Sequence, residues 1–136
     1  MIDINEYSEK MRNAPLFQGM GFQRVISLEE EGTAKFEFKA EEHHCHSGNI
    51  VQGGYVTGWI DTTMAHAAMA KTNFGSNPLT LELKVSFLRS AHPGILTTSA
   101  SVIKLGKTMA FLEGSLIDGE GNIVAKGSST NRLIPR

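Results

Sequence analysis

The fold is decided by the stretch Gly53-Gly54-Tyr55-Val56-Thr57-Gly58-Trp59-Ile60-Asp61-Thr62-Thr63-Met64-Ala65-His66-Ala67-Ala68-Met69-Ala70. Its small and apolar residues predict a buried helix of about 18 residues, roughly 27 Å long. One face can pack on a sheet; it carries Val56, Trp59, Ile60, Thr63 and Ala67. The other face is almost free of bulky side chains; it carries Gly54, Thr57, Gly58, Asp61, Ala65 and Ala68. Both faces of such a helix are expected to pack against other parts of the protein.

Asp61 is the only acidic residue in this stretch. Burying an ionised carboxylate costs several kcal/mol unless the group is paired or hydrogen-bonded. The step Gly53-Gly54 would present free backbone N–H groups at the helix N-terminus, where they can hold a carbonyl oxygen or an anion. Together these features suggest acyl chemistry. Structural alternatives stay open for both features: Asp61 could cap a broken helix or pair with a buried cation, and the glycines could serve only a tight turn.

The segments on either side of this helix read mainly as strands. Residues 3–13 have the spacing of a short amphipathic helix, and 22–29 with 33–39 predict a hairpin. In 79–87 the alternation predicts that Leu79, Leu81, Leu83, Val85 and Phe87 share one face and that Thr80, Glu82, Lys84 and Ser86 share the other. Three more strands are expected at 95–105, 108–118 and 122–132, and their turns imply antiparallel pairing. We therefore predict one α+β domain over 1–136, an antiparallel sheet wrapped around one central helix, with a second subunit covering the rest.

Composition restricts the possible functions. A net charge of −1 gives no electrostatic reason to expect nucleic acid or a membrane surface as a partner. The lone Cys45 excludes an intrachain disulfide and fits a reducing compartment. The N-terminus lacks the pattern of a signal peptide, and no apolar run approaches the roughly 20 residues that span a bilayer. A cytoplasmic location is expected.

The run His43-His44-Cys45-His46 raises the question of a metal. Adjacent side chains in a loop rarely converge on one ion, and no second cluster of His and Cys completes a site, so we expect none. His66, five residues after Asp61, is expected to be structural or solvated. Cys45 has no activating neighbour that would make it a nucleophile.

Four segments together resemble the hotdog-fold acyl-CoA thioesterases of the PaaI-like (phenylacetate-pathway, 4-hydroxybenzoyl-CoA thioesterase) type. They are His44 to Gly54 (HCHSGNIVQGG), Ile60 to Thr63 (IDTT), Leu81 to Ala91 (LELKVSFLRSA) and Leu105 to Thr108 (LGKT). The resemblance covers about residues 15–134. It implies the hotdog fold and a hydrolase that needs no cofactor beyond the coenzyme A carried by its substrate.

The resemblance also implies roles for individual residues. The family signature runs Asn or Gln, Gly, then His-Gly-Gly, with an acid on the helix. Gly53 matches the glycine whose N–H binds the thioester carbonyl, with Gly54 beside it, and Asp61 matches the acid that serves as nucleophile or as base for water. Gln52 stands where the motif has His, His46 where it has Asn or Gln, and Asn49 where it has the earlier glycine. Gln52 can still orient the substrate, and His46 can place water or bind the carbonyl.

Other residues are expected to hold the rest of the substrate. Arg89, Lys104, Lys107 and Thr108 are candidates for the CoA phosphates, and Gly106 would let the backbone approach a nucleotide, although the cations could equally be solvated strand charges. An acyl pocket is expected from apolar side chains: Tyr55, Trp59, Leu81, Leu83 and Phe87, closed by Phe17 and Met20.

Gly53 and Asp61 are roughly 12 Å apart along the helix, too far to serve one carbonyl. We therefore expect a homodimer with two composite sites, in which Gly53 of one subunit meets Asp61 of the other. Such dimers are expected to pair again into homotetramers. Two other functions stay open: a silent acyl-CoA sensor, and a dehydratase, which Gln52 disfavours because that chemistry usually pairs His with the acid.

Overall fold

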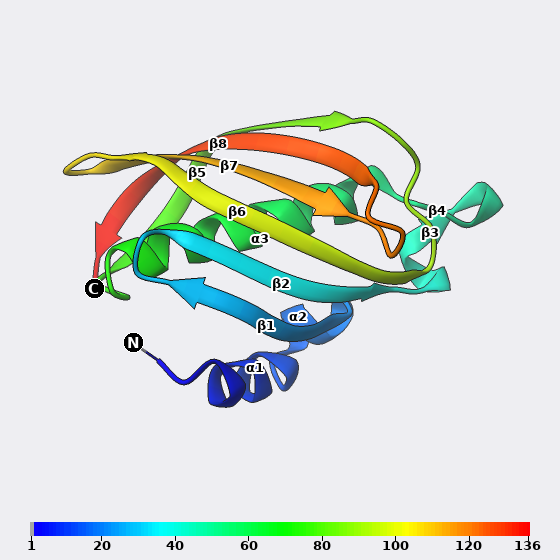
Figure 1. The fold of residues 1–136 in the computed structure, drawn as a ribbon, viewed down its shortest axis with the longest axis horizontal. Helices are drawn as coiled ribbons and strands as arrows, with labels where there is room; N and C mark the ends of the chain where they lie inside the picture. The colour runs from blue at the N-terminus through cyan, green and yellow to red at the C-terminus, as the bar shows by residue number, and fades with distance from the viewer. Residues whose placement is uncertain (1) are drawn as a thin grey trace.

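The computed structural model describes residues 2–136 and shows an antiparallel sheet curved around one long helix (Figure 1). The helices are α1 (Ile4–Arg12), α2 (Pro15–Gly19) and α3 (Gly53–Lys71). The main strands are β1 (Phe22–Glu29), β2 (Thr33–Ala40), β5 (Ser76–Phe87), β6 (Gly94–Leu105), β7 (Met109–Ile117) and β8 (Ile123–Pro135). They form one sheet in the order β1-β2-β6-β7-β8-β5. The predicted α+β hotdog architecture is confirmed.

Between β2 and α3 the chain forms a small loop structure. It contains two short 3₁₀ turns, η1 (Glu42–His44) and η2 (Ser47–Asn49). Strands β3 (Cys45–His46) and β4 (Ile50–Val51) pair with each other rather than with the main sheet. This loop projects beyond the sheet next to the N-terminus of α3 (Figure 1). It therefore supplies the entry to the helix.

The packing of α3 follows the predicted division of its faces. The sheet-facing residues are fully buried or nearly so: Val56, Trp59, Ile60, Thr63 and Ala67. On the opposite face Thr57, Gly58, Asp61 and Ala65 are only half-buried, whereas Ala68 is buried. Thr63 Oγ1 lies 2.6 Å from Thr98 Oγ1 and joins the helix to β6 inside the core. A strip of α3 that begins near its N-terminus is thus left without full cover.

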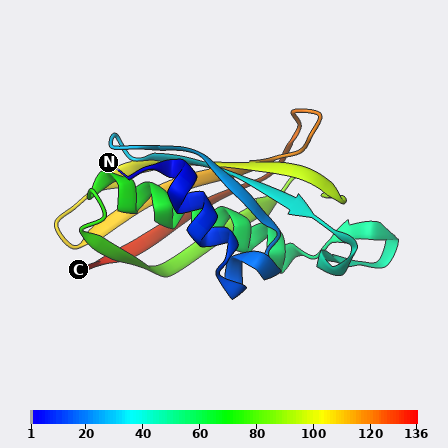
Figure 2. The ribbon, with the colours of Figure 1, turned by 90° about the horizontal axis from the view of Figure 1, so that it is seen from below.

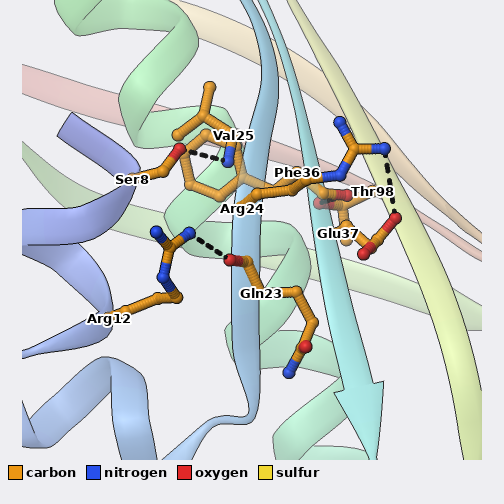
Figure 3. Close-up of polar contacts among 8 residues, drawn as sticks. All are labelled: Ser8, Arg12, Gln23, Arg24, Val25, Phe36, Glu37 and Thr98. Carbon is orange, nitrogen blue, oxygen red and sulfur yellow. Dashed lines mark hydrogen bonds and ion pairs between the residues drawn. The ribbon is translucent and has the colours of Figure 1, made fainter. Parts of the chain in front are cut away.

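The N-terminal helices cover one flank of α3. Figure 2 shows α1 crossing the helix on the side away from most of the sheet. Ser8 Oγ accepts a hydrogen bond from Val25 N–H (2.8 Å), and the Arg12 guanidinium donates to the carbonyl of Gln23 (2.8 Å), so α1 is fastened along β1 (Figure 3). Because β1 is one edge of the sheet, α1 protects that edge from pairing with another chain. The short helix α2 was not predicted.

Strand β5 differs from its prediction. Its register with β8 shifts between Thr80 and Glu82, which makes Leu81 a bulge. Before the bulge, Thr80 points to α3; after it, Leu83 and Val85 do, while Leu79 and Leu81 are exposed (55% and 56%). The expectation of a single apolar face over 79–87 is therefore wrong, because one extra residue exchanges the two faces of a strand.

His66 is buried where α1, α2 and β2 meet α3. Its Nδ1–H donates to the carbonyl of Thr62 (2.7 Å), which leaves Nε2 to accept from the Tyr7 hydroxyl (2.8 Å). The rings of Phe17 and Phe36 pack on it. Burial lowers the pKa of His66 from 6.5 to about 4, and the hydrogen bond to Thr62 only partly opposes this. His66 was expected to be structural or solvated, and these contacts show the structural role.

This lowered pKa predicts a loss of stability in acid. The unfolded chain takes up a proton at His66 near pH 6.5 and the folded chain only near pH 4, so the contribution is complete above about pH 6.5 and is lost as pH falls toward 4. The loss is about 3 kcal/mol, from a difference of roughly 2.5 pH units at 1.36 kcal/mol each. Urea unfolding at pH 7, 5.5 and 4 measures it. His66→Gln should weaken the pH dependence, whereas His43→Gln, at an exposed position, should keep it; equal slopes in both variants would contradict the assignment.

Candidate active site

The N-terminus of α3 offers one free backbone donor. The side chain of Gln52, the residue before the helix, accepts a hydrogen bond from Gly54 N–H (Oε1, 2.7 Å). The carbonyl of Gln52 accepts from Tyr55 N–H (3.0 Å). Among residues 2–136 no acceptor is found for Gly53 N–H. Gln52 therefore caps the helix, occupies Gly54, and leaves Gly53 available to a ligand.

Gly53 opens on a cavity of about 410 Å³. The cavity lies between β3, β4, the start of α3 and the end of β5; its lining consists of His46, Ile50, Val51, Gly53, Val56, Phe87, Leu88, Arg89, Ser90 and Ala91. The ring of Phe87 covers Gly53 so closely that a Cβ at that position would lie 3.3 Å from it. The free N–H, an imidazole and a guanidinium thus share one mostly apolar hollow. That combination suits a carbonyl compound with a negatively charged extension.

Asp61 lies two turns further along α3 and does not line this cavity. Its Oδ1 accepts a hydrogen bond from the Thr80 hydroxyl on β5 (2.9 Å). Within the described part of the chain Asp61 forms no ion pair, and the helix around it is unbroken from Gly53 to Lys71. Neither structural alternative for Asp61 is therefore realised. A half-buried carboxylate without a cation keeps its capacity to accept a proton or to attack an electrophile.

Thr80 is a residue of the site that the sequence reasoning missed. Perfect alternation in 79–87 placed it on the outer face, and the Leu81 bulge turns it inward. The signal in the sequence was weak: Thr80 is a polar residue among alternating leucines, just after Asn77-Pro78. Phe87 was expected only in an acyl pocket, but its ring also covers Gly53.

The histidines of the loop have separate roles. His44 is buried, accepts from Glu41 N–H at Nδ1 (2.9 Å), and donates from Nε2 to the carbonyl of Gly19 (2.8 Å), so both ring nitrogens serve the fold. His43 is exposed and rests on the ring of His44. His46 reaches the cavity. No group of three His, Cys, Asp or Glu side chains in residues 2–136 is arranged to hold a metal ion.

The remaining candidates are dispersed. Asn49 has a left-handed backbone (φ 55°), and its carbonyl accepts from His92 Nδ1 (3.0 Å). Leu83 packs against the core beside α3. Tyr55 packs on His44 and Trp59, and Trp59 has no exposed surface, so Trp59 cannot line an acyl pocket as expected. The hairpin that carries Lys104, Gly106, Lys107 and Thr108 is exposed at the opposite end of the molecule from the β3–β4 loop (Figure 1). One protomer therefore does not bring all of these residues together.

The cap predicts a measurable effect on stability. Gln52→Ala removes the acceptor of Gly54 N–H and should lower the free energy of unfolding by about 1 kcal/mol, the usual effect of losing a side-chain cap. Gly54→Ala should act similarly, because its Cβ would lie 2.6 Å from Gln52 Oε1. Urea unfolding at pH 7 measures both. Gln18→Ala, at an exposed position, is the control, and an equal loss there would contradict the capping role.

Comparisons with known proteins identify a family and relatives that this chain resembles. The family model described as the thioesterase superfamily matches residues 48–125, which include Gly53 and Asp61. A Saccharolobus solfataricus relative named "Putative esterase SSO2140" is 32% identical over 103 residues, or 76% of this chain and 72% of the relative. No helix among residues 2–136 has the length and apolar character that crossing a membrane requires.

Two solved structures show the same fold. The E. coli PaaI protein from the phenylacetic acid degradation operon aligns with a TM-score of 0.83 at 21% identity, over 96% of this chain and 91% of that chain. The protein smu.793 from Streptococcus mutans, solved with acetyl-CoA bound, aligns with a TM-score of 0.77 at 18% identity, over 85% and 90% of the two chains. The family model thus confirms the resemblance to the thioesterase superfamily, and the two structures share the fold of this chain.

Proposed function

The chain belongs to the thioesterase superfamily, and on this premise we propose that it is an acyl-CoA thioesterase whose reaction centre is shared between two protomers. Two observations carry the proposal: among the described residues, the N–H of Gly53 has no acceptor and the carboxylate of Asp61 has no cation partner. One protomer would supply the carbonyl-binding group and its neighbour the acid. The acetyl-CoA in the Streptococcus mutans protein supports a CoA thioester as the substrate.

The open edge of the sheet supports pairing of protomers at β5. Among the described residues β5 pairs only with β8, whereas the other edge strand, β1, is covered by α1. Leu79 and Leu81 expose apolar surface on β5, which would be buried if two copies paired along this strand. Asp61 contacts β5 through Thr80, so such pairing would put the carboxylate near the partner. We extend the proposal to a homodimer, with further pairing into tetramers, in the cytoplasm.

The chemistry assigns one step to each group. Gly53 N–H and the positive end of α3 stabilise the negative charge that develops on the thioester oxygen. Asp61 removes a proton from water as the water oxygen bonds to the carbonyl carbon, or attacks that carbon itself and forms an anhydride that water then opens. Collapse of the adduct breaks the C–S bond, and the CoA thiolate leaves and takes up a proton. The reaction as proposed needs no metal or redox cofactor.

The other polar residues would position the substrate. His46 and Arg89 border the cavity into which Gly53 opens, so His46 can contact the reacting carbonyl and Arg89 the pantetheine or phosphate portion. Gln52 acts through the helix cap. The hairpin cations Lys104 and Lys107 lie far from the cavity of their own protomer, so any contact with CoA would be made at the site shared with the partner. Asn49 and Thr108 would contribute main-chain and hydroxyl contacts.

Asp61→Asn tests the acid. It should reduce kcat for acyl-CoA hydrolysis by about 100-fold or more, because an amide neither accepts the proton nor attacks. Thiol release from a panel of acyl-CoA substrates measures turnover, and calorimetry with a non-hydrolysable thioether analogue should show that binding is retained. His46→Ala and Gln52→Ala should have smaller effects. Unchanged turnover in Asp61→Asn, or tight binding without turnover in the unmodified protein, would overturn the catalytic assignment.

Gly53→Pro tests the N–H donor itself. Proline lacks the N–H but suits the first position of a helix, and Gln52 already has the extended conformation (ψ 136°) that precedes proline. We expect kcat/KM to fall about 100- to 1,000-fold, the usual effect of losing one oxyanion donor. Gly53→Ala is the matched control, since it meets the same Phe87 ring and keeps the N–H. If the two variants lose activity equally, steric hindrance rather than the donor explains the loss.

Mixing the two inactive variants tests the composite site. A dimer of one Asp61→Asn and one Gly53→Pro protomer would contain one intact site. Refolding the variants together at equal amounts should therefore restore about a quarter of the wild-type activity, because half of the dimers are mixed and each has one of two sites. Each variant refolded alone is the control. Failure to recover activity, with mixed dimers verified by mass spectrometry, would place both groups in one protomer's site.

A further inference from the structure

Asp61 belongs to a chain of polar groups that continues into the sheet. The Thr80 hydroxyl, 2.9 Å from Asp61 Oδ1, also lies 3.2 Å from Asn131 Oδ1 on β8. The other end of that amide, Nδ2, donates to Ser129 Oγ (2.9 Å), which in turn is 3.6 Å from Met64 Sδ on α3. Asn131 is 1% exposed and Ser129 is 6% exposed. The mechanism proposed above uses neither of them.

Thr80 and Asn131 are direct cross-strand neighbours in the register of β5 with β8. The register shift follows immediately at Leu81, so the bulge fixes the Thr80 side chain between Asn131 and the helix. A buried asparagine at this place needs partners for both ends of its amide. Thr80 and Ser129 are the two partners within reach.

The hydroxyl of Thr80 has a single proton, and in this arrangement two oxygen acceptors, Asp61 Oδ1 and Asn131 Oδ1, compete for it. Rotation of the amide by 180° removes this competition. Asn131 Nδ2 then donates to Thr80 Oγ1, Thr80 donates wholly to the Asp61 carboxylate, and Ser129 donates to Asn131 Oδ1. Each proton goes to the better acceptor: the carboxylate rather than an amide oxygen, and the amide oxygen rather than a thioether.

We propose that Asn131 is a positioning residue for the reaction, which donates to Thr80 and so commits the threonine hydroxyl to Asp61. Resting on the proposed function, this inference goes beyond it, because it assigns a role to a buried residue that does not contact substrate. The hydrogen bond from Thr80 would hold one carboxylate oxygen in place and leave the other to meet water or the thioester carbon. The orientation of the acid is thus set from β8 through β5.

Asn131→Leu, of similar volume, distinguishes the two orientations. If Asn131 donates to Thr80, its loss frees the hydroxyl to turn away from Asp61, and kcat should fall about 3- to 10-fold with little change in KM. If Asn131 instead accepts from Thr80, its loss would release the proton to Asp61, and kcat would stay the same or rise, which would overturn the proposal. Asn131→Ala provides the same comparison if the leucine variant does not fold.

The control variants separate positioning from general destabilisation. Thr98→Val removes another buried hydroxyl that links α3 to the sheet, and it should leave kcat unchanged although stability falls. Thr80→Ser should keep the activity and Thr80→Val should lose it. In the Thr80→Val background Asn131→Leu should have no further effect on kcat, because Asn131 acts through that hydroxyl. Independent, multiplying losses would indicate a structural role and overturn the proposal.

A measurement without turnover keeps this inference separate from the proposed function. In NMR spectra of the ¹⁵N-labelled protein, the Nδ2 protons of Asn131 should show NOEs to the side chain of Thr80. Their resonances should shift in Thr80→Val. NOEs to Ser129 alone would overturn the orientation whether or not the protein hydrolyses thioesters. Active wild-type enzyme with no effect of Asn131→Leu would overturn only the role of Asn131.

Discussion

The hydrogen bond from Thr80 to Asp61 connects the central helix to the edge of the sheet at the point where the chemistry is expected. A carboxylate in a helix of small apolar residues needs stabilisation, and a buried cation would provide it at the cost of reactivity. A hydroxyl satisfies one oxygen and leaves the negative charge unneutralised. The rest of the site depends on this choice, because an acid already paired with Lys or Arg would be a poor base and a poor nucleophile.

At the N-terminus of α3, too, the fold satisfies one polar group and leaves another free, but here the groups are hydrogen-bond donors. A helix leaves its first N–H groups without partners, and the sequence supplies a side-chain acceptor for only one of the two glycines. Gln52 engages the N–H of Gly54, and of the two glycines only Gly53 lines the cavity. The absence of a side chain at Gly53 matters because Phe87 lies over it. One glycine thus maintains the helix cap, and the other maintains access to a ligand.

Much of this arrangement could be predicted from the sequence. The apolar spacing from Val56 to Ala67 located the central helix and its buried face, and the hairpin over 22–39 followed from alternation. The predictions that failed concerned contacts between residues that are far apart in the sequence. Alternation could not reveal that Leu81 is a bulge, because that depends on the register between β5 and β8, and so Thr80 was placed on the wrong face. Likewise, the burial of His44 depends on Gly19, which is distant in sequence.

The two edges of the sheet support the proposal that two copies of the chain share the site. At β1 the side chains of Ser8 and Arg12 bind the strand's free backbone groups, so α1 closes that edge. At β5 the described residues offer no such cover, and leucines are exposed there instead. Natural proteins rarely leave a long edge strand both unpaired and apolar. The edge that bears Thr80 is therefore the one where a second copy would join. The proposed shared site would need that copy, because Asp61 lies beside this edge, about 12 Å along α3 from Gly53.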